Sequence, residues 1–391
     1  MTETSYSRRA LLPEGLRDDL PPWAEHEAAM VDRLMATFAA HGYERVAPPL
    51  VEFEESLLAF SGAGQAKSMF RLLDPVSHRM MALRADMTLQ VARIATTRLG
   101  AAPRPLRLSY AGHVLRVRGT QLRPARQFRQ AGVELIGADG VAADLEIILL
   151  AAEALATLGV RDLSIDLVSP TLVPAITTAL GLTAEAAAAA RHALDAKDVG
   201  ALETITGEAK EVLAGLMHAA GRAADAAPRI AALPLEGEAA RVRDRYLATA
   251  EALAARAPDL TVTLDPGEMR GFEYQTGIGF AFFARGVRGE LGRGGRYAAR
   301  HPDGHGEPAV GFSMYLDSLL RAIPAPAPAR RIYCPPGTDA DAARRLREEG
   351  WRTVAGLGAV ENARAEAQRL GCSHVFDIEA GAIAALAPEG D

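Results

Sequence analysis

Hydrophobic positions divide the first part of the chain into a helix and several strands. Met30, Leu34 and Phe38 are apolar and fall at helical spacing, which predicts an amphipathic helix from about Trp23. The segment YERVAPPLVEF that follows is predicted to be extended, because two consecutive prolines cannot lie inside a helix. Around residues 80–95 the pattern indicates a short strand, a turn and a helix.

Residues 104–137 alternate apolar and polar positions on both sides of an arginine-rich centre. Leu106, Leu108 and Tyr110 share one parity, and a second alternating run extends from residue 128 to residue 136. This pattern predicts two antiparallel strands. Their connection is longer than the roughly two to five residues that are usual in a hairpin, so we expect it to be functional or mobile.

The middle of the chain predicts a helical insertion between strands. Residues 141–260 are rich in alanine and follow a helical period, apart from a strand expected near 162–167. The largely helical part is expected at about 168–260. Strands return at 261–298, and residues 309–323 predict a strand that leads into a helix.

A proline–alanine run at 324–331 predicts a semi-rigid linker. After it, residues 332–391 alternate strand, helix, strand, helix, strand, which predicts a small C-terminal α/β domain with a parallel sheet. Residues 1–323 are expected to form an α+β core domain, in which an antiparallel sheet flanked by helices carries the helical insertion.

Composition excludes several classes of protein. The 391 residues carry a net charge of −6, with 49% hydrophobic and 24% charged residues, which is typical of a soluble globular protein of two or three domains. The acidic balance argues against an extended nucleic-acid footprint. The most apolar stretch, 145–160, is interrupted by two glutamates and is too short to span a membrane. The first residues have no secretory signal pattern.

The cysteines indicate a reducing compartment. Cys334 and Cys372 are far apart and have no histidines at ligand spacing, so we expect no disulfide, no metal, no cofactor and a cytoplasmic location.

Nearly all basic residues of the chain are arginines, because Lys67, Lys197 and Lys210 are the only lysines. A single arginine is therefore weak evidence for a site.

The stretch MRGFEYQTGIGFAFFARG, residues 269–286, begins with polar residues before it turns apolar. We expect its apolar part to be a strand. Arg270, Tyr274 and Gln275 then either cap that strand at the surface or line a pocket.

Several segments, in order, resemble the catalytic core of class II aminoacyl-tRNA synthetases, and most closely histidyl-tRNA synthetase. PEGLRDDLP resembles the N-terminal loop of that family, and GYERVAPPLVEF resembles its motif 1. YAGHVLRVRGTQLRPARQFRQAGVELIG is similar to motif 2, and AVGFSMYLDSLLRAI to motif 3. RGFEYQTG and GGRY resemble the segments that close over histidine. The resemblance covers roughly residues 11–323 and implies a class II synthetase-like fold.

An amino-acid ligand needs a cation for its carboxylate and acceptors for its ammonium. Arg116 and Arg270 are candidates for the carboxylate, because guanidinium groups bind planar anions with two hydrogen bonds. Asp86, Thr88 and Gln130 are candidates to accept from the ammonium. In the synthetase family the matching positions contact histidine.

Glu134 is the candidate contact for an imidazole N–H. It lies four residues after Gln130 on the same strand face, and a carboxylate within an apolar strand is costly to bury without a partner. The family has two adjacent tyrosines in the RGFEYQTG segment. Here Tyr274 is the first, and Gln275 replaces the second, so the resemblance implies that both line the histidine site.

The positions that serve ATP in the family depart from its pattern. Arg118 stands where motif 2 has an acidic residue, and Ser318 stands where motif 3 has an arginine that binds phosphate. Tyr315 occupies a place where the family prefers glycine. A neutral hydroxyl cannot replace a guanidinium in stabilising phosphoryl charge, so we expect a pocket that binds an amino acid without activating it.

The resemblance therefore extends to histidyl-synthetase-like regulatory subunits of ATP phosphoribosyltransferase, the first enzyme of histidine biosynthesis. It implies a non-catalytic protein that binds and activates a short-form catalytic subunit, contributes to histidine feedback, and forms a homodimer within a hetero-oligomer. A divergent histidyl-tRNA synthetase and a paralogous amino-acid ligase are the alternatives. Both alternatives require ATP chemistry.

Overall fold

The fold is described from a computed structural model, which covers residues 11–58, 68–121, 123–205, 207–269, 271 and 274–386. The chain divides into two compact units, Met1–Pro324 and Ala325–Asp391. This division falls within the proline–alanine run expected to be a linker. Each unit is described below by itself.

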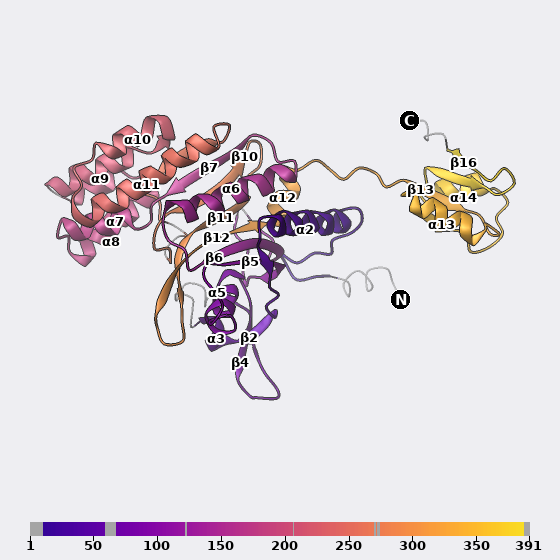
Figure 1. The fold of residues 1–391 in the computed structure, drawn as a ribbon, viewed down its shortest axis with the longest axis horizontal. Helices are drawn as coiled ribbons and strands as arrows, with labels where there is room; N and C mark the ends of the chain where they lie inside the picture. Colours follow the sequence, from indigo (N-terminus) through magenta and orange to yellow (C-terminus); the bar gives the residue numbers. More distant parts are fainter. Residues whose placement is uncertain are drawn as a thin grey trace. The chain divides into compact units, whose positions relative to one another are not determined.

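Among the described residues, a nine-stranded sheet forms the centre of the first unit (Figure 1). Its strand order is β1-β5-β6-β12-β11-β10-β7-β9-β8. Most neighbours are antiparallel, as predicted, but β1 with β5 and β7 with β9 are parallel. The strands are β1 Glu44–Arg45, β5 Leu106–Leu115, β6 Gln127–Ile136, β7 Leu163–Val168, β8 Gly221–Arg222, β9 Thr261–Asp265, β10 Gly279–Ala284, β11 Gly292–Arg300 and β12 Gly306–Tyr315.

Three helices cover one face of this sheet and bury its main core. Ala131, Val133 and Leu135 of β6 point into this core, because alternate residues of a strand face the same way. The helix predicted near the N-terminus is confirmed, and its Leu34 and Phe38 are fully buried in the same core. The helices are α2 Trp23–Ala40, α6 Val141–Thr157 and α12 Leu316–Ala322.

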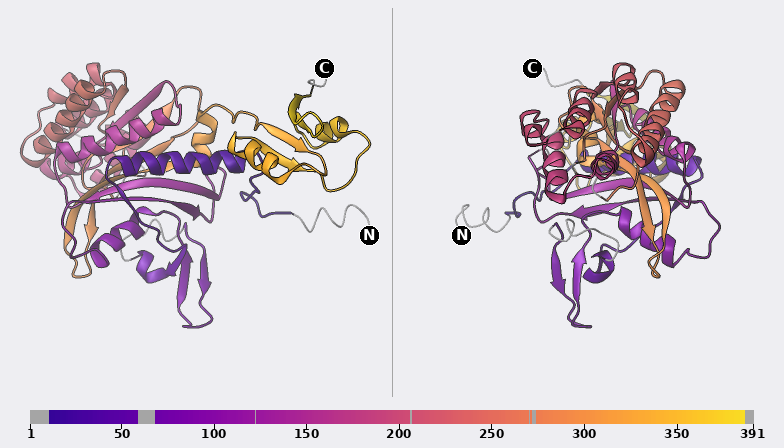
Figure 2. Two further views of the ribbon diagram at one scale, coloured as in Figure 1. Left: turned by 45° about the vertical axis from the view of Figure 1, so that its right-hand side comes forward. Right: turned by 90° about the vertical axis from the view of Figure 1, so that its left-hand side faces the viewer.

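The opposite face carries α5, Thr88–Thr97, and a small three-stranded sheet. Helix α5 packs on β5 and β11 through Val91 and Ala95. The small sheet has the order β2-β4-β3 and projects away from the main sheet (Figures 1 and 2). Its strand β3, which the sequence pattern did not predict, is exposed along its length. The elements are β2 Val51–Phe53, α3 Glu54–Leu58, β3 Arg71–Leu73 and β4 Met80–Leu83.

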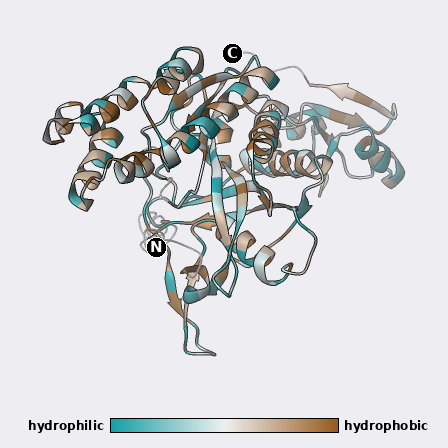
Figure 3. Ribbon diagram, turned by 60° about the vertical axis from the view of Figure 1, so that its left-hand side comes forward, coloured by the Kyte–Doolittle hydropathy of each residue, from teal (hydrophilic) through white to brown (hydrophobic). Residues whose placement is uncertain are grey.

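The helical insertion, which lies between β7 and β9 in the chain, forms a second core and also contributes Ile230, Tyr246 and Leu253 to the main core. Its helices carry alternating hydrophobic and hydrophilic stretches (Figure 3). The side chain of Thr183 caps one of them by accepting from the Ala186 backbone N–H at 3.2 Å. The elements are α7 Leu172–Ala179, α8 Ala184–Ala196, η1 Gly200–Thr204, α9 Glu208–His218, α10 Ala223–Ala231 and α11 Gly237–Arg256.

The second unit is a small α/β domain with the strand order β14-β13-β15-β16. The three predicted strands pair in parallel, but β16 is an additional strand that pairs antiparallel with β15. The short run AIAA gave too little pattern to predict it. The elements are β13 Arg331–Cys334, α13 Ala340–Glu348, β14 Arg352–Ala355, α14 Ala363–Arg369, β15 His374–Asp377 and β16 Ala382–Ala385.

The polar start of residues 269–286 lies before the strand. Strand β10 begins at Gly279, so Tyr274 and Gln275 belong to the segment that joins β9 to β10. Within the described ranges, no helix is both long enough and apolar enough to cross a membrane.

Candidate ligand-binding cleft

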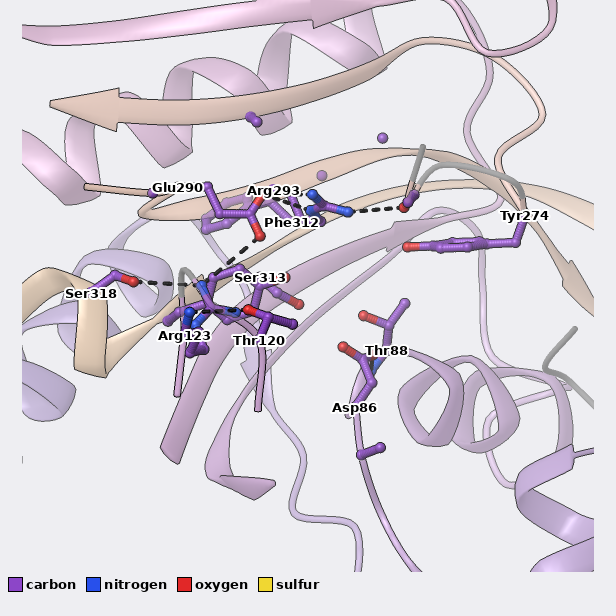
Figure 4. A pocket seen from close by; sticks show the side chains of 18 of the residues that line it. Asp86, Thr88, Thr120, Arg123, Tyr274, Glu290, Arg293, Phe312, Ser313 and Ser318 are labelled. Carbon is purple, nitrogen blue, oxygen red and sulfur yellow. Dashed lines mark hydrogen bonds and ion pairs between the residues drawn. The ribbon is translucent and has the colours of Figure 1, made fainter. Parts of the chain in front are cut away.

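A cleft of about 870 Å³ opens on the sheet face that carries α5. Its lining residues on β6 and β12, such as Glu134, Ser313 and Tyr315, alternate with those that point into the main core. Side chains gather at two separate places in the cleft (Figure 4). We name the place formed by Glu134, Asp86, Thr88 and Tyr274 the Glu134 half. We name the place formed by Arg123, Tyr315 and Ser318 the Arg123 half.

Glu134 is the centre of the first half. Its side chain is fully buried, with Oε1 accepting from the Tyr110 hydroxyl at 3.0 Å and Oε2 accepting from the Tyr297 hydroxyl at 2.9 Å. Burial raises the pKa of Glu134 to about 8. Gly311 lies directly opposite on β12, where a side chain would collide with the Glu134 carboxyl group.

A chain of hydroxyl and amide groups extends this network toward α5. Tyr110 lies within hydrogen-bond distance of Thr88 Oγ1, at 3.2 Å, and of Ser313 Oγ, at 2.9 Å. Gln130 Nε2 donates to Ser313 Oγ at 2.6 Å and to Asp86 Oδ2 at 2.8 Å. Asp86 and Thr88 both line the cleft, so the network holds two of the predicted ligand contacts in place.

The two glutamines predicted as ligand contacts lie behind the lining. Gln130 is 1% exposed, and its Oε1 accepts from the Met87 backbone N–H at 3.0 Å. Gln275 is 7% exposed, and its Nε2 donates to the Gly294 carbonyl at 3.0 Å, while its Oε1 is buried without a hydrogen-bond partner among the described residues. Neither residue is among the described residues that line the cleft. In this structure both support the wall, because their amides are directed to neighbouring protein groups.

Arg116 and Tyr274, two of the candidate ligand contacts, line the cleft. Arg116 donates to the Ala85 carbonyl at 3.4 Å, and its guanidinium lies 5.1 Å from the centre of the Phe128 ring. Tyr274 is 46% exposed and packs edge-to-face on Tyr297, with 6.5 Å between ring centres. The Tyr274 ring reaches over Asp86 and Thr88 (Figure 4). Arg270 lies outside the described residues.

Arg123 is the centre of the second half. It is buried, with 8% of the residue exposed. Its guanidinium stacks on Tyr315 at 3.7 Å from the ring centre. Its nitrogens lie 3.4 Å from Asp317 Oδ2, 3.5 Å from Ser318 Oγ and 3.9 Å from Glu290 Oε1. Arg123 Nε and Asp317 Oδ1 are buried and have no hydrogen-bond partner within the described part of the chain.

Arg123 therefore connects residues that the sequence singled out separately. Tyr315 and Ser318 both depart from the synthetase pattern, and both contact the Arg123 side chain. Arg118, the third departure, lies exposed at the edge of the cleft. The space beside motif 3 is thus occupied by a guanidinium from the chain itself.

Four functional candidates were not named individually from the sequence, although Tyr297 ends the GGRY segment; they are Tyr110, Tyr297, Ser313 and Arg123. The first three meet Glu134 or its partners only through strand register, which the sequence pattern does not specify. Arg123 is one of several arginines in its loop, and only the fold distinguishes it. Within the described residues, no cluster of three or more His, Cys, Asp or Glu side chains could hold a metal ion.

The chain is similar to known proteins over most of its length. Residues 15–319 match the family model for histidyl-tRNA synthetase. The ATP phosphoribosyltransferase regulatory subunit of Rhodospirillum centenum is 56% identical over 367 residues, which cover 94% of each chain. That of Paramagnetospirillum magneticum is 54% identical and covers 95% of this chain and 97% of its own.

A solved structure from Bacillus halodurans, described as an ATP phosphoribosyltransferase regulatory subunit/histidyl-tRNA synthetase, superimposes with a TM-score of 0.78. It is 26% identical and covers 92% of this chain and 96% of its own. The class II synthetase-like fold predicted from the sequence is confirmed. The chain belongs to the histidyl-tRNA synthetase family and, within it, to the regulatory subunits of ATP phosphoribosyltransferase.

Proposed function

We propose that this regulatory subunit binds L-histidine in the Glu134 half of the cleft and transmits its occupancy to a catalytic ATP phosphoribosyltransferase subunit. The observation that carries the proposal is the buried Glu134 carboxyl group, which faces the cleft between two tyrosine hydroxyls. Burying a carboxyl group costs free energy unless the group is hydrogen-bonded or paired. A raised pKa in a cleft is typical of functional sites.

The groups around Glu134 match the parts of a histidine molecule. Arg116 would bind the carboxylate through its guanidinium. Asp86 and Thr88 would accept from the ammonium, and Glu134 would pair with the imidazole. Tyr274 would cover the ligand from the open side. Support for this placement comes from the fact that all five residues line one cleft.

The Arg123 half supports a non-catalytic role. Adenylate formation would need cations placed on the phosphates of ATP, but Ser318 offers only a hydroxyl. The Arg123 guanidinium, which could supply a charge, is stacked on Tyr315 and directed to Asp317. We therefore place the phosphoribosyl transfer on the partner chain, a short-form catalytic subunit located with this protein in the cytoplasm.

A homodimer within the larger assembly is part of the proposal. Apolar side chains are exposed on and beside the small sheet, which lies next to the motif 1 segment; they are Leu50, Leu72, Leu73, Val76 and Met80. Exposed apolar groups that gather in one place are typical of interaction surfaces. Light scattering of the isolated protein should give twice the mass of one chain, and a monomer would contradict this part.

Histidine calorimetry tests the ligand. We expect micromolar binding to the wild type and at least about 30-fold weaker binding to Glu134→Ala, because the imidazole loses its partner and the Tyr297 hydroxyl loses its acceptor. Glu153→Ala, which removes an exposed glutamate of α6, is the control and should bind normally. Wild-type affinity in Glu134→Ala would place histidine elsewhere.

Two further assays separate the regulatory role from the alternatives. Mixed with a short-form phosphoribosyltransferase from the same source, the protein should co-elute with it and raise its turnover. Histidine-dependent pyrophosphate exchange should be absent. Exchange at an ordinary enzyme rate would favour a synthetase or a ligase instead.

A further inference from the structure

The segment between β9 and β10 supplies one wall of the cleft. Its described residues Glu268, Gly271 and Tyr274 line the cleft. This segment contains no helix or strand of its own among the described residues. Its position must therefore be set by what holds its two ends.

The helical insertion holds the first end. Lys197, the residue that follows α8, donates from Nζ to both carboxylate oxygens of Asp265, at 2.7 and 2.5 Å. Two residues earlier, Asp195 Oδ1 accepts from the Met269 backbone N–H at 2.9 Å. The Met269 side chain is 5% exposed and is buried in the core of the insertion.

Lys197 is placed for this contact by the way α8 ends. It adopts a left-handed conformation, with φ at 54°, which is uncommon for a residue with a side chain. It is also one of only three lysines, in a chain whose other basic side chains are arginines and histidines. Both oxygens of Asp265 are engaged, and Asp265 Oδ1 also accepts from the Gly267 backbone N–H at 3.3 Å.

Strand β11 of the cleft holds the other end. Arg293 Nη1 donates to the Gly271 carbonyl at 3.0 Å, and the Thr276 backbone N–H donates to the Arg296 carbonyl at 2.8 Å. The segment is thus attached to the insertion on one side and to the ligand-facing strand on the other. A movement of either attachment changes where the cleft wall lies.

We infer that the C-terminal end of α8 is a positioning clasp, through which Asp195 and Lys197 set the place of the cleft wall and couple the helical insertion to ligand occupancy. The inference rests on the proposed function for the identity of the ligand. Asp195 and Lys197 do not line the cleft, so they act through the β9–β10 segment. Coupling of this kind is reciprocal. If the contacts of Asp195 and Lys197 favour the position of the wall that binds the ligand, the bound ligand in turn stabilises these contacts.

The double variant Asp195→Ala/Lys197→Met tests the clasp by histidine calorimetry. We expect its dissociation constant to rise at least about fivefold, the lower end of ordinary coupling between sites. Lys197→Arg keeps the charge and should retain most of the affinity. Arg241→Met removes a cation from an exposed ion pair on α11 of the same insertion and should leave the dissociation constant unchanged.

Hydrogen exchange separates positioning from general loss of structure. Histidine should slow amide exchange at the end of α8 in the wild type and in Arg241→Met. In the double variant this slowing should disappear at α8 but persist in β6 around Glu134. An unchanged dissociation constant together with retained protection at α8 would overturn the inference.

Failure of the ligand proposal gives a different result. If the wild type binds no histidine, the proposed ligand is wrong, and the clasp is then tested in the free protein. Amides at 265–269 should exchange faster in the double variant than in Arg241→Met. Equal rates there would overturn the clasp regardless of the ligand.

Discussion

The two halves of the cleft bury ionisable groups in opposite ways. Around Glu134, tyrosine hydroxyls donate to both carboxyl oxygens, and burial raises the pKa of Glu134 to about 8. Around Arg123, a guanidinium lies near two carboxylates at 3.4 and 3.9 Å, and two buried polar atoms lack hydrogen bonds within the described chain.

This difference shows which half is ready for a ligand. A satisfied hydrogen-bond network holds its shape before a ligand arrives, which lowers the cost of binding. The Arg123 half instead occupies its own space with an arginine stacked on Tyr315.

The first prediction concerns the stability cost of the Glu134 carboxyl group. Its folded-state pKa of about 8 lies above the value of 4.5 expected without the fold, so the folded protein keeps a proton that the unfolded chain releases. Its contribution to stability is complete below pH 4.5 and is lost as the pH rises to 8. The free energy of unfolding of the wild type, minus that of Glu134→Gln, should fall by roughly 3 to 4 kcal/mol between pH 5 and pH 8.

Urea denaturation at several pH values measures this difference, and Glu146→Gln is the matched control. The hydrogen bond from Arg107 lowers the pKa of Glu146, so its contribution is lost only as the pH falls below 4.5. The wild type minus Glu146→Gln should therefore be flat between pH 5 and pH 8. A flat Glu134→Gln difference would show that Glu134 is ionised at neutral pH.

The second prediction concerns the space that the Glu134 carboxyl group occupies. Gly311→Ala places a methyl group against that carboxyl group and near the Val133 carbonyl, and should lower the free energy of unfolding by about 3 kcal/mol. Histidine binding should fall below detection, because Glu134 must move. Chemical denaturation and calorimetry check both effects.

Gly306→Ala is the matched control on the same strand. A methyl group there would make ordinary contact with the Ala298 side chain, so stability should change by less than about 0.5 kcal/mol. Normal histidine binding by Gly311→Ala would refute the placement of the ligand at Glu134.

Strand alternation made much of this half predictable. The sequence placed Glu134 and Gln130 on one face of β6, and the structure has both on the face that carries α5. The sequence pattern did not show how far each side chain lies from the cleft. Three hydrogen bonds hold Gln130 behind Asp86 and Ser313. Whether a polar strand residue reaches a ligand or supports its neighbour depends on side chains from other strands, which a single sequence does not place.

The Arg123 half was predictable only as a set of departures from a pattern. Ser318 and Tyr315 were visible as departures from the family pattern, and the loss of ATP activation that they imply stays a prediction. The sequence did not indicate that the Arg123 side chain contacts both residues, because Arg116, Arg118 and Arg123 have the same chemistry in one loop. The loop's path decides which arginine is buried, and loops lack the periodicity that makes strands and helices predictable.

The third prediction tests whether the two halves are independent. Arg123→Met should lower the free energy of unfolding by about 2 kcal/mol, because Asp317 loses its buried cation. The loss is smaller than for a tightly bonded pair, because the Arg123 contacts are long and Glu290 keeps its ion pair with Arg293 at 2.7 Å. Histidine affinity should change less than about twofold, because no described residue is a hydrogen-bond partner of both Arg123 and the Glu134 network.

A double-mutant cycle with Asp317→Asn completes the test. Once Asp317 is neutral, removing Arg123 leaves no buried charge without a partner, so the double variant should be more stable than Arg123→Met alone. Equal stability would mean that Asp317 does not depend on Arg123. A large loss of histidine affinity in Arg123→Met would mean that the two halves form one site, since a guanidinium buried on Tyr315 can affect the ligand only through a wall that both halves share.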